Sequence, residues 1–220
     1  SDDLGRTWKN NAGGGIAGLV PGGESASIRI DSPGTVVRNI KFRWGQMNTT
    51  TQFVDDTGRV HVIGWQNPPD AKAGTTDKNQ WRYFHYHGVA GAAWTGSRLL
   101  FYGRKPQIVV DRAGNAWWVY TKGAQRDYGG RVDPGGVPTV DMASRSGGWS
   151  DRKTVWRSDG QFVGEPLIDH DRWRDAGVLS VYAQEKPAEA GAPSALRVMD
   201  FDLGAATDGI AGPPGGRLRN

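Results

Sequence analysis

The sequence predicts an all-β fold, a β-propeller built of four-stranded antiparallel blades. Three observations predict this class. A strand, a Val-Asp-x-x-Gly turn and a second strand occur around Asp55 and again around Asp111, and a weaker copy of this unit surrounds Asp169. The copies are 56 and 58 residues apart, which fits a repeated unit of four short strands. Helical periodicity is nearly absent along the chain.

The first expected element is a tight hairpin at residues 1–8. These residues read Ser-x-Asp-x-Gly-x-Thr-Trp, the pattern called an Asp-box. We expect Asp3 to accept hydrogen bonds from its own turn, Gly5 to supply a positive φ, and Trp8 to fold back as an apolar plug between neighbouring sheets. Because such a hairpin lies in the middle of a blade, the chain is expected to enter the propeller inside an incomplete first blade.

Each later repeat continues with a third strand. We expect these third strands at residues 81–86, 138–143 and 195–201, the first two followed by segments that carry Trp94 and Trp149. The hairpin and three whole blades account for residues 1–203, so about three to four blades lie on this chain. They form either a compact four-bladed ring or, as we favour, part of a larger one. Residues 184–194 and 204–220 are rich in Ala, Gly and Pro, which predicts a long surface loop and a loose C-terminal tail.

Composition limits the function classes. The 220 residues include no Cys, which excludes disulfides, thiolate metal sites and a Cys nucleophile. No apolar run reaches the about 18 residues that a membrane span needs. The net charge of +4 suits an anionic partner, and the cationic residues are scattered rather than clustered, so an acidic polysaccharide is favoured over nucleic acid. The ten Trp residues suit either sugar stacking or wedges between blades.

Several features carry a resemblance to a known family. They are the Asp-box, the Val-Asp-x-x-Gly turns, Tyr83–His87, Lys105–Asp111, Glu165-Pro166 with Asp169 and Arg172-Trp173, and the ending Leu196–Leu203. Together they resemble the secreted BNR-repeat propellers that include ulvan lyases and the lyases cutting L-rhamnose-α-1,4-D-glucuronate bonds. The resemblance implies a seven-bladed ring, a secreted or periplasmic protein, and substrate at one end of the central channel.

The resemblance also implies β-elimination. A cation pairs with the uronate carboxylate and acidifies the C5 proton, a His or Tyr removes that proton, and a second group protonates the leaving oxygen. The family's catalytic His pair corresponds here to Met47-Asn48 and Gln66-Asn67, and neither position holds His. The chain therefore resembles the C-terminal half of such a protein, and we expect the main acid–base groups on an N-terminal half.

The catalytic residues are accordingly unknown, and the weak candidates are His85 and His87. These residues alternate along a strand, so both should point to the same face, where two imidazoles can act as acid and base or form a structural pair. No third His or carboxylate at a helpful spacing completes a metal triad, so no metal site is predicted. Asp133, Asp141 and Asp151 are too dispersed to specify a Ca²⁺ loop, and a structural Ca²⁺ or Zn²⁺ stays open.

The substrate-binding candidates are Arg104, Lys105 and Arg172. Arg104 and Lys105 precede Pro106 at the start of an innermost strand, where a cation can meet a uronate carboxylate or form a salt bridge between blades. Arg172 has the same choice, with Asp169 as the expected local partner. No nucleotide-binding motif is present.

The leading hypothesis is thus part of a secreted polysaccharide lyase acting on rhamnose- and uronate-containing glycans. One alternative is a sialidase- or rhamnosidase-like glycoside hydrolase, although no clear carboxylate pair stands out. Another is a non-catalytic carbohydrate-binding propeller.

Overall fold

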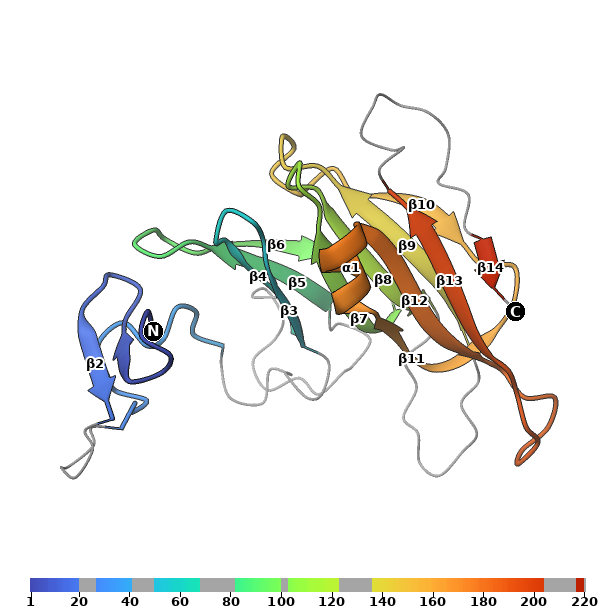
Figure 1. Ribbon diagram of the computed structural model, residues 1–220, viewed down its shortest axis with the longest axis horizontal. Helices are drawn as coiled ribbons and strands as arrows, with labels where there is room; N and C mark the ends of the chain where they lie inside the picture. Colours follow the sequence, from blue (N-terminus) through green and yellow to red (C-terminus); the bar gives the residue numbers. More distant parts are fainter. Residues whose placement is uncertain are drawn as a thin grey trace.

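The computed structural model describes residues 1–19, 27–40, 50–67, 82–99, 103–122, 136–203 and 217–219 (Figure 1). A hairpin is formed by β1 (Thr7–Lys9) and β2 (Gly15–Gly18). The first blade comprises β3 (Thr51–Val54), β4 (Val60–Gln66), β5 (Arg82–Gly88) and β6 (Thr95–Leu99). The second comprises β7 (Gly103–Val110), β8 (Ala116–Lys122), β9 (Val137–Ala143) and β10 (Lys153–Arg157). The third comprises β11 (Phe162–Ile168), β12 (Val178–Glu185), β13 (Leu196–Asp202) and β14 (Arg217–Arg219), with α1 (His170–Ala176) between β11 and β12.

The predicted blade architecture is confirmed. Each blade is a four-stranded antiparallel sheet whose strands pair in chain order, and the hairpin forms a separate two-stranded sheet. The third strands predicted from the sequence are β5, β9 and β13. Residues 217–219 depart from the expected loose tail, because β14 pairs with β13 and completes the third blade. Among the described residues, no helix is long and apolar enough to cross a membrane.

The N-terminal hairpin follows the Asp-box expectation in its turn. Asp3 accepts hydrogen bonds from the backbone N–H and the hydroxyl of Thr7, at 2.8 and 2.7 Å, and these bonds lower its pKa to about 2. Gly5 has a φ of 85°. The Trp8 indole folds back as expected and donates to the Gly5 carbonyl at 3.1 Å. The expected plug between sheets is wrong for the described residues, because Trp8 is 41% exposed and no described sheet covers it.

Each blade fixes its first turn by the same device. The turn aspartate accepts a hydrogen bond from a ring on the second strand of its own blade. His61 Nε2 meets Asp55 Oδ2 at 3.3 Å, and Trp117 Nε1 donates to Asp111 Oδ2 at 2.9 Å. In the third blade, the Tyr182 hydroxyl donates to Asp169 Oδ2 at 3.2 Å. These three rings occupy equivalent positions in their blades. In each blade, the last residue of the first strand pairs with a residue of the second strand, and the ring residue comes directly after that partner.

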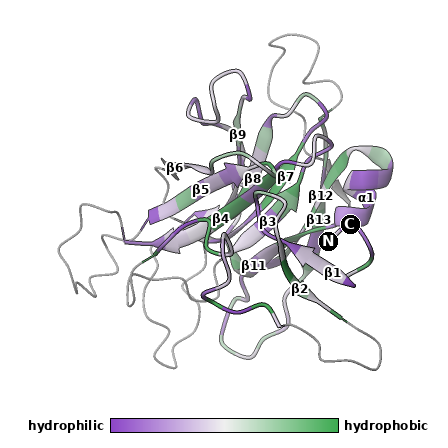
Figure 2. Ribbon diagram, turned by 90° about the vertical axis from the view of Figure 1, so that its left-hand side faces the viewer, coloured by the Kyte–Doolittle hydropathy of each residue, from purple (hydrophilic) through white to green (hydrophobic). Residues whose placement is uncertain are grey.

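The blades pack face to face around their first strands. β7 lies between β3 and β11, so these three strands form the hub (Figure 1). One core joins Ile63 and Tyr83 of the first blade to Trp118 and its neighbours in the second. The other joins Trp117 of the second blade to the third. Figure 2 shows the hydrophobic residues gathered on β7, β8 and β12.

The face of the third blade that is turned away from the second blade, which we name the forward face, is partly exposed among the described residues. Leu167 and Leu196 are 57% and 65% exposed there, whereas the residues at the same sheet positions in the second blade, Val109 and Val140, are 0% and 1% exposed. The second blade buries these positions beneath the third. The forward face of the third blade thus has the pattern of a face that receives another sheet.

The strands define two ends of the molecule. The turns after β3 and β7, and α1 after β11, lie together at one end, which we name the turn end. The inner strands begin at the opposite end, which we name the loop end. This division decides which of the predicted site residues can act together.

Candidate functional site

Lys105 lies on the innermost strand of the second blade, near the loop end. The pairing of β7 with β8 is interrupted between Arg104 and Gln107, and Lys105 has a φ of 37°, which a non-glycine residue rarely adopts. Its backbone N–H donates to the Tyr83 hydroxyl of the first blade at 3.0 Å. The bulge and this bond hold a strained backbone that turns the lysine out of the regular ladder.

The Lys105 ammonium forms an ion pair with Glu165 of β11. The two side chains retain 34% and 46% of their exposure, so the pair lies open to solvent. β11 is also irregular, with a register shift between Val163 and Leu167. Two inner strands therefore bulge where they present opposite charges to each other. The inter-blade salt bridge that the sequence offered as an alternative is present, and exposure leaves the lysine accessible to a competing carboxylate.

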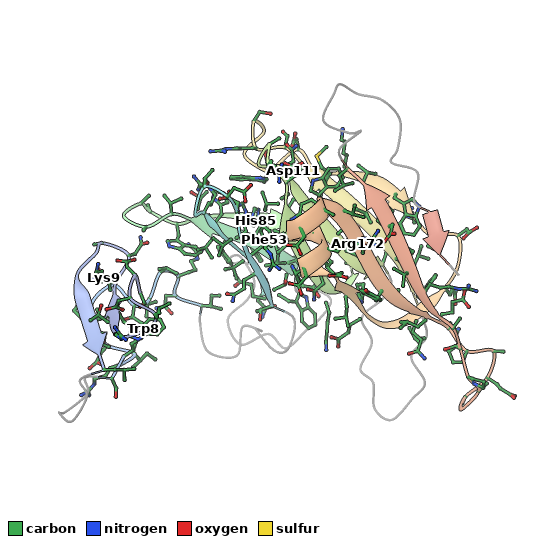
Figure 3. The ribbon with its side chains drawn as sticks, viewed as in Figure 1. Trp8, Lys9, Phe53, His85, Asp111 and Arg172 are labelled. Carbon is green, nitrogen blue, oxygen red and sulfur yellow. The ribbon has the colours of Figure 1, made fainter. Side chains whose placement is uncertain are left out.

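Arg104 and Arg172 do not join Lys105 in one described site. The Arg104 backbone belongs to β7, and its side chain lies outside the described residues. Arg172 lies on α1 at the turn end (Figure 3), where its guanidinium donates to Asp200 at 3.0 Å. Asp169, the partner expected from the sequence, instead caps α1 by accepting the Arg172 backbone N–H at 2.9 Å. Arg172 and Lys105 thus lie toward opposite ends of the inner strands.

His85 and His87 share one face of β5, as predicted, and a third histidine joins them. Their ring centroids are 5.2 Å apart. His61 on β4 stacks on His85 at 5.1 Å, with 2.9 Å between His61 Nδ1 and His85 Nε2. His61 and His85 are fully buried and His87 is 8% exposed. A polymer cannot reach His85 in this arrangement, so the cluster belongs to the interface between the first and second blades.

The hydrogen bonds fix the protons in this histidine cluster. Burial alone would raise the pKa of Asp55, but hydrogen bonds from Thr57, Arg59 and His61 outweigh it and lower that pKa. The ionised Asp55 carboxylate accepts a hydrogen bond from His61 Nε2–H, so His61 Nδ1 accepts a hydrogen bond from His85 Nε2–H. His85 Nδ1 is left as a bare acceptor with no partner among the described residues. Arg59 donates to His87 Nδ1 at 3.3 Å, which places the His87 proton on Nε2.

All three imidazoles are held neutral. Burial is the main cause of the lowered pKa of His61, and the hydrogen bond with Asp55 only partly offsets it. Burial, reinforced by the two neighbouring histidines, places the pKa of His85 well below its usual value. Burial, His61 and Arg59 lower the pKa of His87 to about 4. The cluster therefore acts as packing at neutral pH rather than as a reservoir of protons.

Trp149 closes the histidine cluster from the second blade. Its ring lies edge-on to His61, His85 and His87 at 5.1, 5.7 and 4.4 Å, and its indole N–H donates to the Gly114 carbonyl at 2.9 Å. Alternation along a single strand does not predict that His61 and Asp55 join this group. The signal was the register of two adjacent strands, which pairs His61 with His87 directly.

The carboxylates considered for Ca²⁺ have other partners. Asp141 is buried and accepts from the Tyr120 hydroxyl at 2.9 Å and from Arg152. Asp151 accepts from the backbone N–H and hydroxyl of Ser144. Asp133 lies outside the described residues. Within the described ranges, no group of three or more His, Asp or Glu side chains is arranged to hold a metal ion.

Comparisons with known proteins agree with this architecture. Residues 1–100 match the family described as "BNR repeat-containing family member". The fold is similar to that of a crystal structure described as polysaccharide lyase Uly1, with a TM-score of 0.51 and 19% sequence identity over 89% of this chain. The chain spans 36% of that protein's length. No curated protein matches by sequence. The predicted resemblance to BNR-repeat propellers is confirmed, and the structural similarity supports the propeller fold.

Proposed function

We propose that this chain is part of a polysaccharide lyase that cleaves acidic, rhamnose- and uronate-containing glycans by β-elimination. The observation that carries the proposal is the fold similarity to a polysaccharide lyase over most of the chain. Two features of the chain support it further: a net charge of +4 and an accessible lysine on an inner strand.

Lys105 is the proposed carboxylate-binding residue. A uronate carboxylate that enters at the loop end replaces Glu165 as the partner of the ammonium. Neutralising that carboxylate makes the neighbouring C5–H more acidic, which lowers the barrier to proton removal. A base then takes the proton and an acid protonates the departing glycosidic oxygen, leaving an unsaturated uronate.

We propose that the base and the acid lie on further blades of the same ring. The buried Gln66 and Asn67 stand where the resemblance puts a catalytic histidine, and amides do not titrate near neutral pH. The exposed Leu167 and Leu196 on the forward face of the third blade support a ring that continues beyond it. A polymeric glycan as substrate favours a secreted or periplasmic location.

The test is incubation with ulvan and with rhamnosyl-glucuronate oligosaccharides, using the protein together with any further blades. Ultraviolet-absorbing unsaturated ends support the proposal. New reducing ends without absorbance indicate a glycoside hydrolase instead, and binding without cleavage indicates a carbohydrate-binding propeller.

The contribution of Lys105 is separable. Lys105→Met should weaken binding of the uronate-containing oligosaccharide, because the cation that meets its carboxylate is removed. Lys9→Met is the matched control, since Lys9 also forms a solvent-exposed ion pair, with Asp2 on the N-terminal hairpin (Figure 3). Equal binding by the two variants would remove Lys105 from the site.

A further inference from the structure

A hollow of about 660 Å³ lies at the turn end, next to the hub strands. It is bounded by the end of β3, the turn after β7, helix α1 and Leu203. Its volume falls within the range of about 300–1000 Å³ that small-molecule sites occupy. The hollow is distinct from the Lys105–Glu165 pair, which lies toward the loop end of the same inner strands.

The blade repeat supplies the polar rim of this hollow. In each blade, the turn aspartate accepts hydrogen bonds from groups of its own turn, and the residue that follows it lines the hollow. These residues are Asp56, Arg112 and His170. All three are exposed. The fold thus brings a carboxylate, a guanidinium and an imidazole from three equivalent positions to one place.

The floor of the hollow is apolar. Phe53, Val54, Val110 and Trp173 line it, and Val54 is 58% exposed there. The Phe53 ring stacks on the His170 ring, with centroids 6.3 Å apart and planes 25° apart. An apolar floor beneath polar side chains suits a pyranose ring, which has C–H faces and a hydroxyl edge.

The charges around the rim nearly cancel. The Asp111 carboxylate accepts from Asn115 and Trp117, and Arg174 is paired with Asp171 and Asp175. Asp56 and Arg112 have no hydrogen bond or ion pair with the described residues, so one carboxylate and one guanidinium of the lining are open to a ligand. A rim with one free charge of each sign favours a neutral, hydroxyl-bearing ligand over an anion or a cation.

We propose that this hollow is a second carbohydrate site, which binds a neutral pyranose unit. Arg112 donates to a ring hydroxyl, Asp56 accepts from another, and the exposed Val54 supports the C–H face. The site goes beyond the proposed lyase function, because it lies at the opposite end of the blades from Lys105 and needs no cleavage. Through this site the protein would bind the neutral sugar units of a glycan.

The test is a ligand-observed NMR titration with methyl α-L-rhamnoside, methyl α-D-glucoside and D-glucuronate. The neutral glycosides should show saturable binding, and glucuronate should bind more weakly. Arg112→Ala and Asp56→Ala should each weaken neutral-sugar binding about tenfold, because each removes a hydrogen bond to a charged group. Arg29→Ala is the matched control: this exposed guanidinium is distant in sequence, pairs with exposed Asp31 among the described residues, and does not line the hollow.

Both rim variants change exposed side chains, so circular dichroism should report an unchanged fold. The inference is overturned if no neutral glycoside binds, if glucuronate binds more tightly, or if the rim variants bind as well as the control. If Lys105→Met loses lyase activity but still binds neutral sugars, that result supports this second site as separate from the proposed lyase function. Retained lyase activity without neutral-sugar binding would refute it alone.

Discussion

Acidification between pH 6.5 and 4.5 should destabilise this protein through the histidine cluster of His61, His85 and His87. Each of these histidines has a folded-state pKa below the usual value, so the unfolded chain binds more protons in this range. The stabilising contribution is complete above pH 6.5 and is lost as the pH falls. The groups that face the cluster are Asp55, Arg59 and, at longer range, Arg145, and the two cations oppose protonation.

The size of the effect follows from His87. Its pKa falls from 6.5 to about 4, and it is 8% exposed, so solvent screening is small. A shift of that size corresponds to at most about 3 kcal/mol of unfolding free energy, of which about 2–3 kcal/mol is lost by pH 4.5. His61 and His85 act in the same direction. If all three histidines contribute, the unfolded chain binds up to three more protons than the folded one, and the unfolding free energy changes by up to about 4 kcal/mol per pH unit.

The assay is urea unfolding followed by tryptophan fluorescence at several pH values from 7.5 to 4.5. Keeping above pH 4.5 separates the histidines from Asp3, Asp55 and Asp169, whose lowered pKa values cost stability only under more acidic conditions. His87→Gln should reduce the slope of unfolding free energy against pH by the amount that corresponds to about one proton taken up on unfolding. His170→Gln is the control, because His170 lies outside the cluster, and its slope should equal that of the parent. A parent protein equally stable at pH 7.5 and 4.5 would refute the reasoning.

Three further predictions concern packing, backbone and charge. Trp149→Ala should lower the unfolding free energy by about 3–5 kcal/mol, measured in urea, because it empties the interface between the first two blades. Gly114→Ala should lower the unfolding free energy by about 1–2 kcal/mol, which is more than the loss from Gly91→Ala. Both glycines have positive φ, but of the two only Gly114 would place a new Cβ 2.6 Å from the Arg145 side chain. Equal thermal midpoints for the two variants would contradict this clash. Lys105→Met should change stability by less than about 1 kcal/mol, because its ion pair is partly exposed; a larger loss in the same assay would make that pair structural.

Much of the fold was accessible from sequence because the repeat is local. A Val-Asp-x-x-Gly turn specifies its own hairpin through bonds between residues at most a few positions apart, as at Asp111 and Asn115. Trp8 shows the limit. Its local contact with Gly5 follows from the motif, but whether a sheet covers it depends on distant segments.

The candidate site was harder to predict. Alternation along one strand is enough to place His85 and His87 on a common face, but adding His61 requires the register of a second strand. Charge partners were harder still. Arg172 binds Asp200 rather than nearby Asp169, because the helix cap leaves the Asp169 carboxylate occupied by backbone N–H and Tyr182 hydroxyl groups.

The partly exposed forward face of the third blade bears on how the protein behaves in concentrated solution. Leu167 and Leu196 are exposed on this sheet, and the same blade carries the Arg172–Asp200 ion pair. Two copies of the chain can associate through these exposed apolar side chains. Self-association should therefore rise with salt, which strengthens apolar contact while screening the charges, and a matching blade added in excess should suppress it.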